Sequence, residues 1–231
     1  MLVSAAVCPH PPLLLPGLSG SADVGAPLHA TCVQAVEEAL APSPDRVVLV
    51  GGADSTRTWD STASVDGPAY GGPGSSAPAG PRLPLSLSVG RTLLDASSWS
   101  GDVVLQSVAV DAPPEECGRL GAALVEGAPT TLLVMGDGSA RRGLKAPGYL
   151  DERAFPFDDR AVQALSCADV ETLSALDPGA AADLLVAGRA PWQVLAGALG
   201  RRPAAGRLLL ADDPFGVLYL VVTWRTSGCA R

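Results

Sequence analysis

Aromatic and charged residues are scarce in this sequence: they make up 4% and 17% of it, whereas 47% is hydrophobic, mostly Ala, Val and Leu. This composition excludes a chain that is disordered throughout and fits a helix-rich α/β protein. The net charge of −8 is offset by no basic run longer than the pairs Arg141-Arg142 and Arg201-Arg202. We therefore expect no nucleic-acid partner, because most of the surface would repel its phosphates.

Closely spaced cysteines are also absent. The five cysteines are Cys8, Cys32, Cys117, Cys167 and Cys229. Their wide spacing and odd number argue against a zinc site and against a secreted disulfide framework, so we interpret them as reduced thiols.

Long apolar runs are missing as well, and none approaches the ~20 residues of a membrane span. The apolar N-terminal segment has no basic residues before it, and His10 and four prolines interrupt it, so it does not resemble a signal sequence. The sequence therefore predicts a cytoplasmic protein without membrane contact.

Strand and helix patterns alternate along the chain, and no hinge divides its 231 residues into two cored halves. Apolar runs at 2–8 and 45–52 flank a helical pattern at 23–40, and strands at 102–110 and 130–135 flank a helix near 114–125. Such crossovers imply parallel strands in one sheet. We predict a single α/β domain over residues 1–231 with three layers, in which helices flank a central mixed, mostly parallel sheet.

Two other segments complete this prediction. Residues 53–82 are rich in Gly, Ser and Pro and are interpreted as an irregular loop, whereas 158–200 predict three or four short helices broken at Asp177-Pro178 and Pro191. Strands at 207–211 and 217–224, joined by the DDPFG link, predict an antiparallel hairpin at a sheet edge.

A ligand site in such a sheet lies beyond the carboxyl ends of its parallel strands. The loops after Cys8, Gly52 and Met135 are expected to converge there, bringing His10, Asp54 and the segment 137–142 together. No GxSxG, Walker or GxGxxG motif stands at a strand end, so hydrolase, P-loop and dinucleotide-binding functions have no motif behind them.

Each candidate residue has a functional and a plain interpretation. His10, held between prolines, could be a metal ligand or an acid/base group, or could bond a neighbouring backbone group. The Gly136–Arg142 segment GDGSARR could be an anion nest that includes Arg141, or a turn in which Asp137 and Ser139 bond their own backbone. The pair Asp212-Asp213 could bind a cation, share a proton, or occupy an edge turn.

Several motifs follow one another along the chain: PHPP at Pro9–Pro12, GDGSA at Gly136–Ala140, APGY at Ala146–Tyr149, Phe157-Asp158, the AGRAPWQVLAGALG helix and the closing DDPFGVLYLV hairpin. In this order they resemble motifs of the LigB-like superfamily of class III extradiol ring-cleavage dioxygenases. The resemblance extends over nearly the whole chain.

The resemblance implies an iron site that this sequence does not complete. In active relatives two histidines and a glutamate hold Fe(II), and a further histidine is the acid/base group. Here His10 matches the first ligand, Asp54 is nearest the second, Asp212 takes the glutamate position and Ala140 replaces the acid/base histidine. One imidazole with carboxylates would favour Mg²⁺, Mn²⁺ or Ca²⁺ over iron. We expect Fe(II) to bind weakly or not at all, leave another divalent cation as an open alternative, and expect no other cofactor.

Two hypotheses for the function follow. In the first, the chain is a catalytically degenerate LigB-like protein that binds a small molecule or serves in assembly. Its former cleft would be lined by His10, Asp54, Asp137, Ser139, Arg141 and the acidic pair Asp212 and Asp213. In the second, the cleft performs altered chemistry, with a non-iron metal or none, and true ring cleavage is the remoter alternative. The resemblance also allows a homo-oligomer, such as a dimer.

Overall fold

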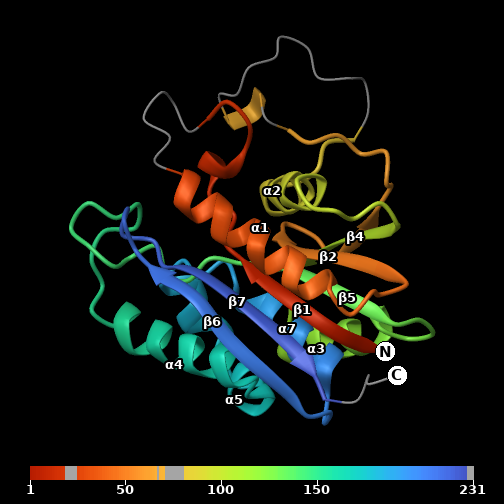
Figure 1. Ribbon diagram of the computed structural model, residues 1–231. Coiled ribbons are helices and arrows are strands. Elements are labelled where there is room, and N and C mark those ends of the chain that lie inside the picture. The colour runs from red at the N-terminus through yellow and green to blue at the C-terminus, as the bar shows by residue number, and fades with distance from the viewer. Residues whose placement is uncertain (19–24, 67, 71–80, 228–231) are drawn as a thin grey trace.

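A seven-stranded sheet forms the centre of the protein, in the order β3-β4-β2-β5-β1-β7-β6 (Figure 1). The computed structural model describes residues 1–18, 25–66, 68–70 and 81–227. The strands are β1 (Leu2–Cys8), β2 (Arg46–Ala53), β3 (Arg57–Trp59), β4 (Asp102–Ala109), β5 (Thr130–Met135), β6 (Ala204–Asp212) and β7 (Tyr219–Thr226).

The four neighbours β4, β2, β5 and β1 are parallel, as the two predicted crossovers require. Every residue of β1 and β5 is buried, which is typical of strands covered by helices on both faces. The predicted hairpin is present: β7 pairs antiparallel with β1, and β6 continues the sheet to its edge. The sequence-based prediction of an α/β fold with a mixed, mostly parallel central sheet is confirmed.

Helices cover both faces of this sheet and give three layers (Figure 1). They are α1 (Ala26–Leu40), α2 (Leu85–Asp95), α3 (Pro114–Leu124), α4 (Ala154–Cys167), α5 (Val170–Ser174), α6 (Pro178–Asp183) and α7 (Arg189–Leu199), with 3₁₀ turns at Pro12–Leu14 and Pro68–Tyr70. One apolar core lies between the sheet and α1 and α2, and the other between the sheet and α3 to α7.

Glycines allow α3 and α7 to approach very closely. A Cβ atom added at Gly121 of α3 would lie 1.9 Å from the carbonyl oxygen of Val194, and one at Gly197 of α7 would lie 2.2 Å from that of Gly118. Neither position therefore accepts a side chain. Because α7 begins at the carboxyl end of β5, this packing also fixes one side of the candidate site.

Three local predictions were wrong. Residues 53–82 are not wholly irregular, because β3 pairs antiparallel with β4 there. The helix α2 was missed altogether. Pro191 does not break a helix but stands in the first turn of α7, where a proline is tolerated because its missing N–H has no intrahelical partner.

Two further observations concern the helices and the cysteines. Within the described ranges, no helix has both the length and the apolar character that crossing a bilayer requires. Cys8, Cys32, Cys117 and Cys167 are free thiols, and Cys229 lies outside the described residues.

Candidate functional site

The loops after β1 and β5 meet at the carboxyl edge of the sheet. These strands pair up to Cys8 opposite Met135, and the backbone N–H of Gly136 donates to the Cys8 carbonyl over 2.9 Å. Beyond this point the backbone N–H of His10 donates to Asp137 Oδ1 over 2.8 Å, and His10 Nδ1 lies 3.7 Å from the same oxygen. Two of the three loops expected to converge are thus in contact.

His10 is nearly covered, with 8% of its surface exposed. Its Nδ1 is buried and, among the described residues, has no hydrogen-bond partner, because the 3.7 Å separation from Asp137 is too long for a hydrogen bond. A buried polar nitrogen without a partner is costly and uncommon. Within the described part of the chain, His10 Nδ1 is therefore an unsatisfied polar atom at this edge.

Tyr219 adds a third polar group to this edge. It begins β7, which pairs with β1 through Val7 and Val222, so Tyr219 lies past the end of β1 near His10. Burial, with a smaller effect of the Asp137 charge, raises the pKa of Tyr219 to about 12. Its hydroxyl thus stays protonated and able to donate. No pattern in the sequence indicated this residue, since a tyrosine in an apolar strand looks like part of the core.

The GDGSARR segment is a tightly bonded turn, so the backbone N–H groups from Gly138 to Arg142 do not form an anion nest. Five successive backbone N–H groups donate to acceptors within the protein: Gly138 to Leu218 O, Ser139 to Asp158 Oδ1, Ala140 to Leu184 O, Arg141 to Ser139 Oγ and Arg142 to Gly216 O. The Asp137 carbonyl accepts from Gly188 N–H at the start of α7. No donor remains among these five to bind an anion.

A buried carboxylate explains why this turn is rigid. Asp158 is fully buried, accepts from Ser139 N–H over 2.9 Å and pairs with Arg142 over 3.1 Å. Arg142 also pairs with Asp213 over 2.6 Å. Burial raises the pKa of Asp158 to about 6, although the Ser139 N–H and Arg142 act in the opposite direction. Sequence reasoning noted Asp158 only as part of a motif and missed this role.

The remaining residues of the turn also serve structure. Ser139 Oγ donates to the Leu184 carbonyl over 2.7 Å, and Arg141 Nη1 donates to the Gly148 carbonyl over 2.6 Å. Ala140, between them, carries no group that can exchange a proton. Ser139 and Arg141 were expected to line a ligand cleft, but these bonds join them to the end of α6 and to the loop itself, while Arg141 Nε is buried without a partner among the described residues.

The third expected loop does not join the site. After β2 the chain turns toward β4, away from β1. There Thr56 Oγ1 accepts from Ala109 N–H, and Ser107 Oγ donates to the Ser55 carbonyl. Asp54 is exposed, and β5 lies between β2, which precedes Asp54, and β1, which precedes His10. The expectation that Asp54 faces His10 was wrong, because it overlooked β3.

The acidic pair lies on the other side of His10. Asp212 stands opposite Tyr219 in the β6–β7 ladder, two strands from β1, which corresponds to about 10 Å between backbones. Its Oδ1 accepts from Asp213 N–H over 2.9 Å, as in a turn, while Asp213 pairs with Arg142. The pair thus forms an edge turn that is bonded to Arg142 of the loop after β5.

These residues do not fit an Fe(II) centre. Such a centre requires two neutral imidazoles and a carboxylate around one point. The edge supplies one imidazole, from His10, and residues 1–18, 25–66, 68–70 and 81–227 contain no group of three or more His, Cys, Asp or Glu side chains placed to hold a metal ion. His10 and Asp212 are therefore not joined there by a third ligand.

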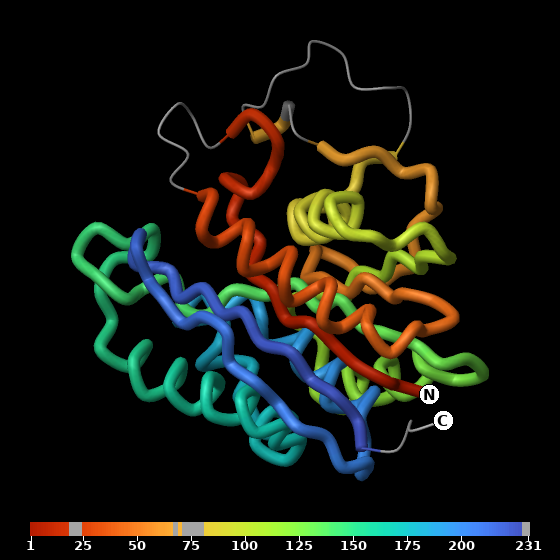
Figure 2. The backbone as a smooth tube through the Cα atoms, in the orientation of Figure 1, coloured from red at the N-terminus to blue at the C-terminus, as the bar shows by residue number. Residues whose placement is uncertain are grey.

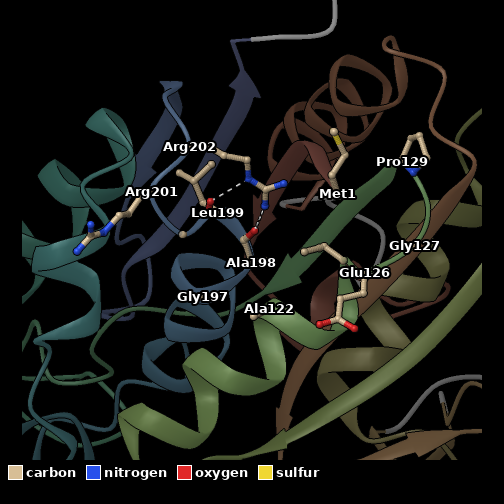
Figure 3. Close-up of a pocket in the computed structure, with 12 residues that line it drawn as sticks. Met1, Ala122, Glu126, Gly127, Pro129, Gly197, Ala198, Leu199, Arg201 and Arg202 are labelled. Atoms are coloured by element: carbon tan, nitrogen blue, oxygen red, sulfur yellow. Dashed lines mark hydrogen bonds between the residues drawn. The ribbon is translucent and has the colours of Figure 1, made fainter.

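None of the hollows described is lined by His10. One of about 730 Å³ lies at the opposite end of the sheet, between the ends of α3 and α7 (Figure 3). Its Arg202 guanidinium donates to the Leu199 and Ala198 carbonyls at the end of α7, and the charged side chains of Arg201 and Glu126 also line it. A smaller hollow of about 230 Å³ is lined in part by Arg142, Asp212 and Asp213.

Comparisons with known proteins identify the fold and nothing further. No protein-family model matches the sequence, and no curated protein matches it. An uncharacterized protein, JW3007 from Escherichia coli K12, has a similar structure, with a TM-score of 0.52. The two share 16% sequence identity, and the match covers 96% of this chain and 99% of the other. At this identity the similarity supports the architecture alone.

Proposed function

We propose that this chain is a LigB-like protein that has lost ring-cleavage chemistry and binds a small molecule at the edge formed by His10, Asp137 and Tyr219. The observation that carries the proposal is the pairing of His10 with Asp137 beside Ala140. The edge keeps a positioned imidazole, but its second metal-binding imidazole and its acid/base histidine are both missing.

The expected ligand is small and carries hydroxyl or carboxyl groups. The buried Nδ1 of His10 has no partner among the described residues, and the Tyr219 hydroxyl is a donor at neutral pH. Protocatechuate carries both kinds of group and is therefore a suitable probe. His10 itself is mostly covered, so the ligand reaches it only when the neighbouring loops shift slightly.

Calorimetry with protocatechuate tests this function. The unmodified protein is expected to bind it, and His10→Ala to weaken binding at least tenfold, which is about 1.4 kcal/mol. Asp54→Ala is the matched control and should leave binding unchanged, since Asp54 is exposed after β2, and β5 lies between β2 and β1. Loading with Fe²⁺ and addition of catechol, gallate or protocatechuate in air should give no ring-opened product above a metal-only blank. Robust turnover, or binding of protocatechuate that is equally tight in His10→Ala, contradicts the proposal.

An enzyme with altered chemistry is the second candidate. A protonated tyrosine and an imidazole are groups that an acid/base reaction uses, and both the Tyr219 hydroxyl and the His10 ring lie near Asp137. Conversion of a bound ligand that stops in both Tyr219→Phe and His10→Ala would favour this candidate over simple binding.

A further inference from the structure

Five large apolar side chains are exposed around one loop. They are Leu144 (66% exposed), Tyr149 (62%), Phe155 (38%), Leu185 (46%) and Phe215 (48%), which we call the Leu144 patch. The other exposed large apolar side chains of the described residues are Met1, Tyr70, Val110 and Leu208. More than half of the exposed large apolar side chains of the described residues thus belong to the Leu144 patch.

Contacts made by residues of the same or adjoining segments place the members of this patch in one region of the surface. Leu185 packs against Gly148, next to Tyr149, since a Cβ atom at Gly148 would lie 2.6 Å from Leu185 Cδ1. The Arg142 guanidinium lies 4.7 Å from the centre of the Phe155 ring. The turn that carries Phe215 packs against Ala146 through Gly216. Figure 2 shows this β6–β7 turn beside the green loop that precedes α4.

The loop holds these side chains outward in a fixed conformation. Tyr149 and Leu185 have φ angles of 60° and 56°, in the left-handed region that non-glycine residues rarely adopt. Hydrogen bonds from Arg141 Nη1 to the Gly148 carbonyl, and from Asp151 N–H to the Arg141 carbonyl, fix the loop. Strain of this kind persists only where surrounding structure imposes it and is concentrated at binding sites. A surface ordered in advance also loses less entropy on binding.

The size of the patch matches the apolar part of a protein interface. With ~150–250 Å² for each aromatic side chain, the exposed fractions of Tyr149, Phe155 and Phe215 amount to about 300 Å². Leu144 and Leu185 add to this area. A stable interface covers ~800 Å² on each partner, somewhat more than half of it apolar.

The charges around the patch are of both signs. Lys145, the only lysine of the sequence, and Arg153 are exposed there, as are Glu152, Asp159 and Asp212. A strongly basic or acidic partner would be complementary to charges of one sign only. In a twofold interface each cation can face an anion of the other copy, because the same surface is used twice. We propose that the Leu144 patch is the interface through which two copies of this chain form a symmetric dimer.

Analytical ultracentrifugation of single variants tests the dimer. The unmodified protein is expected to dimerise, and Leu144→Asp and Phe215→Asp should each raise the dissociation constant at least about 30-fold, the effect of losing a strong anchor. Val110→Asp, which changes an equally exposed apolar residue outside the patch, is the matched control and should not alter it. All three sites are exposed, so folding should be preserved, which circular dichroism verifies.

Chemical cross-linking gives an independent readout. Lys145 is the sole lysine, so apart from the N-terminal amine it is the one group an amine-reactive cross-linker modifies. The reagent should join Lys145 of one copy to Lys145 of the other, a product that peptide mass spectrometry identifies, and Leu144→Asp should abolish it. A monomeric unmodified protein, or one that associates only with a different chain, overturns the proposal. So does a dimer that persists in both patch variants or is broken by Val110→Asp. None of these readouts depends on ligand binding at His10, so the two proposals can fail separately.

Discussion

His10 and Asp137 are 127 positions apart in the chain, yet the His10 backbone N–H donates to Asp137 Oδ1 over 2.8 Å. This bond joins the loop after β1 to the loop after β5 and fixes the backbone that carries the only imidazole at the edge. Because the acceptor is a carboxylate and the donor is largely buried, the bond belongs to the stronger class of protein hydrogen bonds.

Removing this carboxylate should destabilise the fold. Asp137→Ala leaves the His10 N–H without its partner, so we expect a loss of about 1.5–3 kcal/mol in the free energy of unfolding, measured with urea. Asp54→Ala, at an exposed carboxylate, should change it by no more than about 0.5 kcal/mol. Equal effects of the two substitutions would contradict the role assigned to Asp137.

The sequence predicted the strands of this edge better than the site between them. Continuous apolar runs such as Leu2–Cys8 identify buried parallel strands almost by themselves, and their order places His10 and Asp137 at the same edge. The error at Asp54 came from β3, a three-residue strand whose pairing with β4 depends on partners more than 45 positions away. Local patterns carry no trace of such a pairing.

The chemistry of single groups was harder to predict than their position. The spacing of glycines and arginines in GDGSARR is the same in an anion nest as in a closed turn, and only the acceptors supplied by Leu218, Asp158 and Leu184 decide between them. These acceptors come from the β7 end, α4 and the segment after α6. A sequence alone does not show that they meet.

Iron content provides a second prediction. With one imidazole at the edge, the protein purified from cells should carry well under one equivalent of iron, measured by elemental analysis. A ligand at a hundredfold excess over its Kd stabilises the native state by roughly 2.7 kcal/mol, so a true Fe²⁺ site would raise the Tm clearly. We expect no such increase. Stoichiometric iron that survives dialysis would show that ligands other than those identified here bind it.

The third prediction concerns pH. Burial raises the pKa of Asp158 from the ordinary 3.8 to about 6, so the folded protein holds this proton more tightly than the unfolded chain. The resulting stability is fully present below about pH 4 and is lost as the pH rises through about 6. Relative to Asp158→Asn, the unmodified protein should therefore lose up to about 3 kcal/mol across this range. Urea unfolding at a series of pH values measures the difference. A difference that grows with pH would mean that the ion pair with Arg142 outweighs burial.

The last prediction tests the close approach of α3 and α7, which fixes the start of α7 beneath Asp137. Gly121→Ala places a methyl group 1.9 Å from the Val194 carbonyl oxygen, a backbone atom that cannot turn aside. The helices must separate, and overpacking of this kind costs about 1–3 kcal/mol or more. Gly118→Ala, one turn earlier on the same helix, is the matched control because its methyl group meets nothing within 4 Å. It should stabilise the protein by about 0.5–1 kcal/mol, since alanine is the better helix former. Thermal unfolding of both variants measures these opposite shifts. Similar shifts in both would mean that helix propensity, and not the contact with α7, governs this face of α3.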